Sequence, residues 1–237
     1  MSRLSARNTD RMVQALRANA LFAELDPGPL RMLAGCCTAR DAPAGLLLFS
    51  RGDRADGVYV ITAGLVRVWL NDAEGNEMTL ALLGPGAALG EMALADAAPR
   101  SANATALESC RFLFLDAQDF TRAMEREPAI ARHLVALLAA RLRGGNAALM
   151  DMAFLPLRAR LGRKLLELAE AHARPAPPGA VFERVFSQAE LAQMLGASRE
   201  AVNRQLGALR HDGHLRFDGR RMEIPDLARL RASLGAV

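Results

Sequence analysis

Two hydrophobic patterns follow one another in the first half of the chain. Apolar residues recur at helical spacing over residues 8–20, where Met12, Leu16 and Ala20 share a face, and a short helix follows Asp26. Later apolar runs are short and end at turns: 46–49, 58–61, 66–70, 78–83, 102–107 and 110–115. Runs spaced roughly ten residues apart favour an antiparallel sandwich or barrel over alternating strands and helices.

Helical spacing returns after this region. A short helix is predicted over residues 116–125, and a long helix begins at Pro128. Its apolar positions recur every three, four or seven residues: Leu134, Leu138, Leu142, Leu149 and Met152. A narrow stripe over about 24 residues, or roughly 36 Å of helix, is typical of a coiled-coil seam. The alternative is a helix packed on its own domain. Pro156 ends the helix and opens a linker.

The last third of the chain has the helix-capping and turn residues typical of a helix-turn-helix. A helix is predicted over residues 157–173, a loop over 174–179 and a strand over 181–186. Ser187 and Glu190 form a capping-box pattern, Gly196 suits the tight turn, and Ser198 caps a helix over 199–210. Residues 215–224 then read as a hairpin wing. The predicted fold class is therefore α+β.

Polar side chains gather at the start of the second helix of this motif. Arg199, Glu200, Asn203 and Arg204 lie on its exposed face, where they can offer hydrogen bonds to base edges in a major groove. The alternative is a solvated helix whose Glu200 and Arg204 form an i,i+4 ion pair. Three further residues are also expected to contact DNA: Ser187, Gln188 and Ser198. Arg220 in the wing is expected to lie near DNA phosphates.

Composition and charge agree with two modest domains. The chain has 237 residues, and residues 157–237 carry 14 Arg or Lys against 9 Asp or Glu, whereas residues 1–156 carry 16 against 17. A basic last third beside a nearly neutral body points to nucleic acid. No run of about 18 apolar residues indicates a membrane span. Residues 1–7 lack the apolar core of a signal peptide, so we expect a cytoplasmic protein.

The residues that carry most enzyme and metal chemistry are few and scattered. The three cysteines, Cys36, Cys37 and Cys110, make a poor disulfide framework and too small a set for a metal or iron–sulfur site, so they are predicted to be buried thiols. The four histidines are dispersed along the chain, and no nucleophile–base motif accompanies them. We therefore predict neither a metal site nor an enzyme.

One short loop combines a carboxylate with a guanidinium. Gly90, Glu91 and Met92 open it, and Arg100 and Ser101 close it. Arginine offers a planar fork of donors to phosphate oxygens, and an acidic residue can accept from a ribose hydroxyl. The glycine and the alanines between them let backbone N–H groups approach an anion. The alternative is an ordinary turn with a surface ion pair.

The sequence of this loop resembles the phosphate-binding cassette of cyclic-nucleotide-binding domains. Residues 198–204 resemble the recognition helix of the cyclic-AMP receptor protein (CRP/FNR) family. The resemblance covers nearly the whole chain. It implies a cyclic-nucleotide-binding β-roll over residues 1–127, a dimerisation helix and hinge over 128–156, and a winged helix-turn-helix over 157–237. It also implies a homodimer that binds a palindromic TGTGA-like DNA site, acts with RNA polymerase and needs no cofactor beyond its allosteric ligand.

The chain departs from the family where the base is read. By the resemblance, Arg141 lies near the ligand, but Gly145 and Asn146 stand where a Thr-Ser pair contacts adenine. Because Gly145 has no side chain and Asn146 keeps one donor and one acceptor edge, we hypothesise relaxed selectivity, with cyclic GMP a candidate beside cyclic AMP. The alternatives are a ligand-independent or cyclic di-GMP-responsive member of the family. A haem or iron–sulfur sensor has less support.

Overall fold

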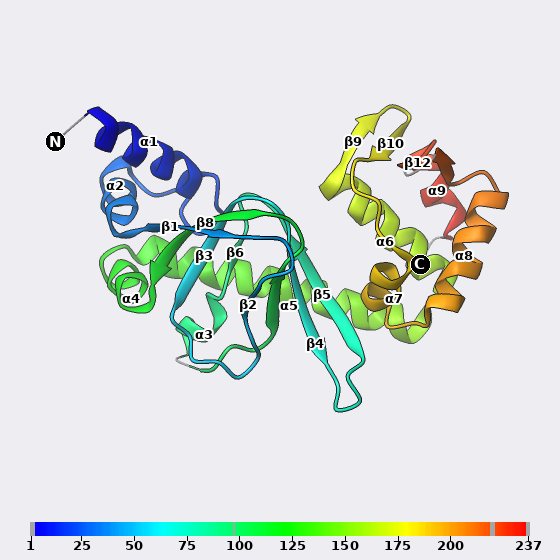
Figure 1. The fold of residues 1–237 in the computed structure, drawn as a ribbon, viewed down its shortest axis with the longest axis horizontal. Coiled ribbons are helices and arrows are strands. Elements are labelled where there is room, and N and C mark those ends of the chain that lie inside the picture. Colours follow the sequence, from blue (N-terminus) through cyan, green and yellow to red (C-terminus); the bar gives the residue numbers. More distant parts are fainter. Residues whose placement is uncertain (1–2, 97, 219–220, 236–237) are drawn as a thin grey trace. The chain divides into compact units, whose positions relative to one another are not determined.

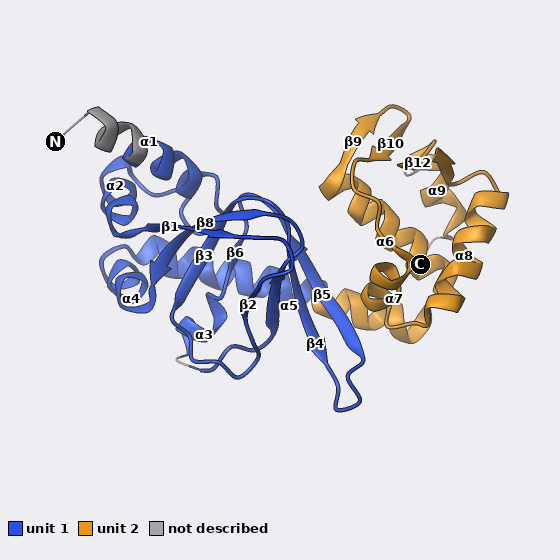
Figure 2. Cartoon of the chain, in the orientation of Figure 1, with its two compact units in different colours: residues 1–144 blue, residues 145–237 orange. Residues whose placement is uncertain are grey.

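The structure is a computed structural model that describes residues 3–96, 98–218 and 221–235. The chain divides into two compact units, residues 1–144 and 145–237 (Figure 2). The boundary falls inside the long helix α5 (Pro128–Phe154). The domain boundaries predicted from the sequence, at 127/128 and 156/157, stay a prediction.

The first unit combines helices with two antiparallel four-stranded sheets (Figure 1). Its helices are α1 (Arg3–Arg17), α2 (Pro27–Cys36), α3 (Met92–Ala95), α4 (Ala117–Arg126) and the first part of α5. Its strands are β1 (Thr38–Ala42), β2 (Leu47–Phe49), β3 (Gly57–Ala63), β4 (Val66–Asn71), β5 (Glu77–Leu83), β6 (Ala88–Leu89), β7 (Asn103–Ala106) and β8 (Cys110–Asp116). The sheet orders are β1-β8-β3-β6 and β2-β7-β4-β5, so the antiparallel sandwich expected from the turn spacing is confirmed.

Strands β3 and β8 are buried on both faces. Val58 and Val60 of β3 pack with α1, α2, α4 and α5 in one core, whereas Tyr59 and Ile61 pack with the second sheet in another. Side chains of a strand alternate between its faces, so a strand covered on both sides must be apolar at nearly every position. This explains the continuous apolar runs in the sequence.

The N-terminal helix ends earlier than its sequence pattern predicts. Residues 8–20 were expected to be helical, but α1 ends at Arg17. Asn19 is buried, its amide donates to the carbonyl oxygen of Gly86 (2.8 Å), and its side-chain oxygen accepts from the backbone N–H of Leu21 (2.9 Å). A side chain that satisfies backbone groups in this way competes with helix formation.

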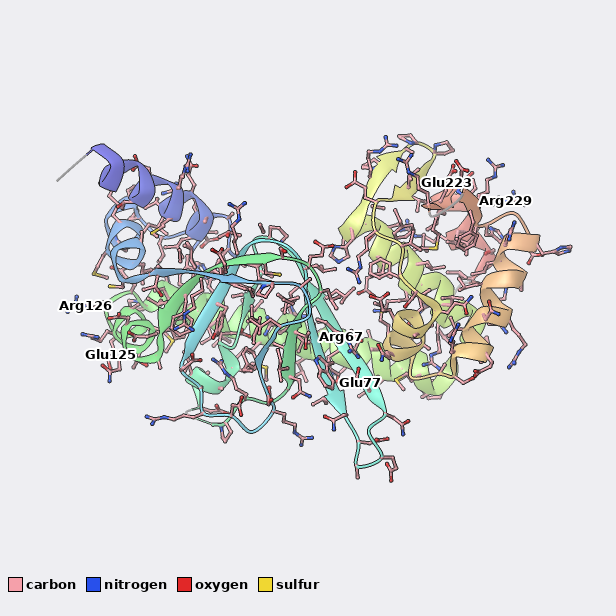
Figure 3. The ribbon with its side chains drawn as sticks, viewed as in Figure 1. Arg67, Glu77, Glu125, Arg126, Glu223 and Arg229 are labelled. Atoms are coloured by element: carbon pink, nitrogen blue, oxygen red, sulfur yellow. The ribbon has the colours of Figure 1, made fainter. Side chains whose placement is uncertain are left out.

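The β4–β5 hairpin is fixed by a largely buried polar cluster between its strands. Arg67 of β4 forms an ion pair with Glu77 of β5 (2.6 Å) and donates to the hydroxyl of Thr79 (2.8 Å), and Figure 3 shows the two charged side chains on neighbouring strands. The guanidinium carbon also lies 5.1 Å from the ring centroid of Trp69. Cross-strand pairs of this kind hold the register of a hairpin.

Helix α5 changes from buried to exposed along its length. Ile130 and Leu134 belong to the core of the first unit. Further along, the side chains of Leu142, Leu149 and Phe154 are 67%, 66% and 70% exposed. Several large apolar residues on one helix segment are rarely left in water, so this segment has the character of an interface.

The second unit is a set of helices packed on a small sheet. Its elements are α6 (Leu157–His172), β9 (Ala173–Ala176), β10 (Gly179–Phe182), α7 (Gln188–Leu195), α8 (Arg199–His211), β11 (Arg216–Asp218), β12 (Arg221–Ile224) and α9 (Leu227–Ser233). The sheet order is β11-β12-β10-β9, and the described pairs are antiparallel. The predicted helix-turn-helix and hairpin wing are confirmed.

The sheet of this unit differs from the sequence prediction at one edge. Residues 174–179 were expected to form a loop and 181–186 a strand, but β9 pairs with β10 from Ala173↔Phe182 to Ala176↔Gly179. Pro175 cannot donate a hydrogen bond to a sheet. It lies in β9 at the edge of the sheet, where a proline is tolerated.

The prediction of three buried thiols is wrong for one of them. Cys37 and Cys110 are buried, but Cys36, the last residue of α2, is exposed. Burial, and to a smaller extent the neighbouring Cys36, raises the pKa of Cys37 to about 12. In the described part of the chain, no helix has the length and apolarity needed to cross a membrane.

Candidate ligand-binding and DNA-binding sites

The loop between β6 and α3 can be built only with glycine at position 90. Gly90 has a φ of +87°, a left-handed conformation that favours glycine. A Cβ atom there would collide with Nη1 of Arg100 and lie 3.0 Å from the carbonyl oxygen of Gly57. The glycine of the predicted cassette therefore makes room for the arginine of the same cassette.

Arg100 is held inside the first unit by three hydrogen bonds. Its side chain is only 1% exposed. Nη1 donates to the carbonyl oxygen of Gly90 (2.7 Å), and Nη2 donates to the carbonyl oxygen of Gly57 (2.8 Å) and to Oδ1 of Asp56 (2.6 Å). The guanidinium carbon lies 4.3 Å from the ring centroid of Phe49. The arginine is thus a buried cation with fixed orientation.

Glu91 is fully buried and is paired with the long helix rather than with Arg100. Its Oε1 accepts from Nη1 of Arg141, whose Nη2 donates to the carbonyl oxygen of Ala88 (2.8 Å). Burial raises the pKa of Glu91, although the charge of Arg141 and, more weakly, that of Arg100 act against this shift. Oε2 is buried and has no hydrogen-bond partner among the described residues.

The structure brings four of the seven predicted ligand residues together. Gly90, Glu91, Arg100 and Arg141 converge on one loop. Two others lie at its exposed edge, where the hydroxyl of Ser101 is 4.0 Å from the sulfur of Met92. Asn146 is exposed on α5, five residues beyond Arg141 and past the boundary between the units.

In the second unit, the helix-turn-helix follows its local signals closely. The hydroxyl of Ser187 accepts from the backbone N–H of Glu190 (3.1 Å), and the Glu190 carboxylate accepts from the backbone N–H of Ser187 (2.8 Å), which completes the capping box. Gly196 ends α7 in the left-handed conformation, and Ser198 caps α8. Both serine hydroxyl oxygens therefore accept from a backbone N–H in the first turn of a helix.

The four polar residues predicted on the recognition helix are all exposed. Arg199, Glu200, Asn203 and Arg204 follow Ser198 on α8 and are exposed, whereas Val202, Leu206 and Leu209 are buried. The carboxamide of Gln188 on α7 donates to the side-chain oxygen of Asn203 (2.8 Å), which ties the two helices together at this surface. Arg220 lies outside the described residues.

A hollow of about 690 Å³ lies between this helix and the wing. Arg199, Asn203 and Arg210 line it from α8, and Phe217 and Met222 line it from β11 and β12. Sequence reasoning missed Arg210, whose guanidinium carbon lies 5.9 Å from the ring centroid of Phe217. Helical spacing could have identified Arg210, because it lies seven residues after Asn203, two turns along the same face of the helix.

Comparisons with known proteins settle the family. The model of the cyclic nucleotide-binding domain matches residues 39–127, and that of the Crp-like helix-turn-helix domain matches residues 159–233. The cyclic AMP receptor protein of Thermus thermophilus is 35% identical over 215 residues, which are 91% of this chain and 96% of that protein. This chain belongs to the CRP/FNR superfamily. It is therefore a DNA-binding transcription regulator with a cyclic-nucleotide-binding domain, and not an enzyme.

Other members of the superfamily agree in length and fold. A CRP-like cAMP-activated global transcriptional regulator of Mycobacterium tuberculosis is 30% identical over 219 residues, or 92% of this chain and 98% of that protein. The solved structure of the c-di-GMP-responsive regulator CLP of Xanthomonas campestris superimposes with a TM-score of 0.73 at 24% identity. It covers 84% of this chain and 99% of its own, and shows the fold alone.

The absence of a metal site stays a prediction. Within the described residues, no three His, Cys, Asp or Glu side chains are grouped so that they could hold a metal ion. At the Gly90 loop, Glu91 pairs with Arg141, and Asp56 pairs with Arg100. Such pairs suit an anionic organic ligand with hydroxyl groups.

Proposed function

We propose that a cyclic nucleotide, with cyclic AMP favoured, binds at the Gly90 loop and controls DNA binding by the second unit. The supporting observation is that a buried arginine, a fully buried glutamate and a helix arginine converge on this loop. Arg100 supplies the charge for the phosphate, and the unpaired oxygen of Glu91 supplies an acceptor for a ribose hydroxyl. The cAMP-activated names of two similar regulators favour cyclic AMP.

Calorimetric titration with cyclic AMP, cyclic GMP and cyclic di-GMP tests the ligand. Arg100→Gln should weaken binding of the true cyclic nucleotide by about 100-fold or more, because a neutral amide replaces the buried cation. Unchanged affinity in Arg100→Gln would exclude this site. Binding of cyclic di-GMP alone, or of none of the three, would favour the two alternative members of the family described above.

Base selectivity is proposed to be relaxed, because Gly145 and Asn146 replace the family's adenine-reading pair. Cyclic AMP and cyclic GMP are compared on the wild type and on Asn146→Ala, with Asn76→Ala as the control at an exposed amide of the β4–β5 turn. A preference for cyclic AMP of more than about 100-fold that Asn146→Ala leaves unchanged would contradict this proposal.

We further propose a homodimer formed through the second half of α5. Its support is the exposed apolar series Leu142, Leu149 and Met152, which has the spacing typical of a coiled-coil seam. The dimer would present two copies of α8 to a palindromic TGTGA-like site, read by Arg199, Glu200 and Arg204. Because its target is DNA, we place the protein in the cytoplasm. Transcription in vitro with RNA polymerase tests whether it acts on that enzyme.

A further inference from the structure

The cation proposed to bind the ligand's phosphate already has an anionic partner within the chain. Asp56 lies just before β3, 44 residues from Arg100 in sequence, and its Oδ1 accepts from Nη2 at 2.6 Å. Carboxylate oxygens and phosphate oxygens bind the same donors of a guanidinium. A phosphate that takes this donor must therefore displace the carboxylate.

The carboxylate is not needed to hold the guanidinium in place. Two of the three hydrogen bonds of Arg100 go to backbone carbonyl oxygens, those of Gly57 and Gly90, and its backbone N–H donates to the carbonyl oxygen of Asp53 (2.8 Å). The ring of Phe49 packs against the guanidinium. By contrast, the Asp56 side chain is 52% exposed. A half-exposed carboxylate can leave its partner at small cost, because water replaces the lost bonds.

A second arginine, Arg40, lies on the other side of the Asp56 carboxylate. Nη1 of Arg40 on β1 lies 3.5 Å from Oδ2 of Asp56 and donates to the hydroxyl of Tyr59 (3.1 Å). The guanidinium carbon of Arg40 lies 3.2 Å from the ring centroid of Phe114, which fixes the side chain against the core. When Asp56 leaves Arg100, Arg40 still balances its charge.

We propose that Asp56 is an internal competitor of the ligand: it neutralises Arg100 in the ligand-free protein, passes to Arg40 when a phosphate binds, and so sets the ligand affinity. This inference rests on the proposed function of Arg100. It makes Asp56 a residue that lowers affinity and Arg40 a residue that restores part of it. An affinity-lowering carboxylate raises the ligand concentration at which the regulator responds.

The test uses the full-length protein and titrations with cyclic AMP and cyclic GMP. Asp56→Asn keeps the size of the side chain and an acceptor oxygen but removes the charge, and should tighten binding by about three- to tenfold. Asp53→Asn is the matched control. It removes the same charge from the same loop, but its carboxylate accepts from the backbone N–H of Ser50 (2.7 Å).

A double-mutant cycle tests the role of Arg40. Arg40→Gln should weaken binding about threefold in the wild type, because the substitution leaves Arg100 as the cation paired with Asp56, and clearly less in Asp56→Asn. Thermal unfolding of every variant identifies any loss of folding.

The outcomes separate this inference from the proposed function. If the wild type binds a cyclic nucleotide and Asp56→Asn binds it equally or more weakly, Asp56 positions Arg100 instead of competing, and the inference is overturned while the ligand site stands. If Asp53→Asn tightens binding as much as Asp56→Asn, the effect is general electrostatics, and the inference again fails. If neither the wild type nor Asp56→Asn binds any cyclic nucleotide, the proposed function is wrong, and the inference falls with it.

Discussion

Arg100 should be important for folding as well as for the ligand, and Arg100→Ala tests this without any ligand. The substitution removes the donor from the carbonyl oxygens of Gly57 and Gly90, which lie against a side chain only 1% exposed. Each unsatisfied buried acceptor costs about 1–3 kcal/mol. The pair with the half-exposed Asp56 adds at most about 1 kcal/mol after solvent screening.

We therefore expect Arg100→Ala to lower the free energy of unfolding of the first unit by about 2–5 kcal/mol. Urea unfolding of the ligand-free protein, followed by fluorescence of Trp69 in the first unit, measures this change. The slope with urea should stay constant, because the surface exposed on unfolding is the same.

Arg122→Ala is the control. Arg122 forms an i,i+3 ion pair with Asp119, but its side chain is 59% exposed, so its removal should cost less than about 0.5 kcal/mol. If Arg100→Ala were as stable as Arg122→Ala, the hydrogen bonds assigned to the buried guanidinium would be absent in solution.

Three further predictions address the carboxylate, the long helix and the recognition helix. The pKa of Glu91 in the folded protein is raised above its usual value of 4.5, so the folded state binds the proton of this carboxyl more tightly than the unfolded state does. The free energy of unfolding should therefore fall as the pH rises from 4.5 through the raised pKa. Urea unfolding should show a smaller fall in Glu91→Gln. Leu142→Asp should convert a dimer to a monomer in light scattering, whereas Leu46→Asp, at an exposed apolar position of the first unit, should not; a dimeric Leu142→Asp would contradict the seam. Arg204→Ala should cost about 1–3 kcal/mol at one base pair of a selected site, whereas Arg220→Ala should weaken all sequences alike.

The parts of the structure that depend on neighbouring residues could be predicted from the sequence. The capping box of Ser187 and Glu190, the turn at Gly196 and the cap at Ser198 each act within about four residues, and the structure confirms all three. Six of the eight described strands in the first unit were also predicted, because turns and apolar runs are local patterns, but the positions of β1 and β6 were not. The end of α1 was missed, since Asn19 is satisfied by Gly86, which is 67 residues away.

The partners of the candidate site could not be predicted in the same way. The sequence placed Glu91 and Arg100 in one ligand loop, and it did not indicate their ion-pair partners: Arg141 for the glutamate and Asp56 for the arginine. Both contacts join segments more than 40 residues apart, and neither leaves a periodic trace. The edge strand β9 was missed because Pro175 reads locally as a loop, and only its place at a sheet edge makes a strand possible.

Glu91 and Arg100 have different partners, and this difference determines how a bound ligand would affect the long helix α5. Arg141 uses one nitrogen for Glu91 and another for the carbonyl oxygen of Ala88, so α5 is tied to both ends of the loop that begins at β6. Glu91 still has one buried oxygen without a partner among the described residues. A ribose hydroxyl could therefore bond to Glu91 without breaking its pair with Arg141, whereas a phosphate that binds Nη2 of Arg100 must displace Asp56. The two halves of the ligand would thus act differently, the ribose by adding to an existing link with α5 and the phosphate by exchanging one anion for another.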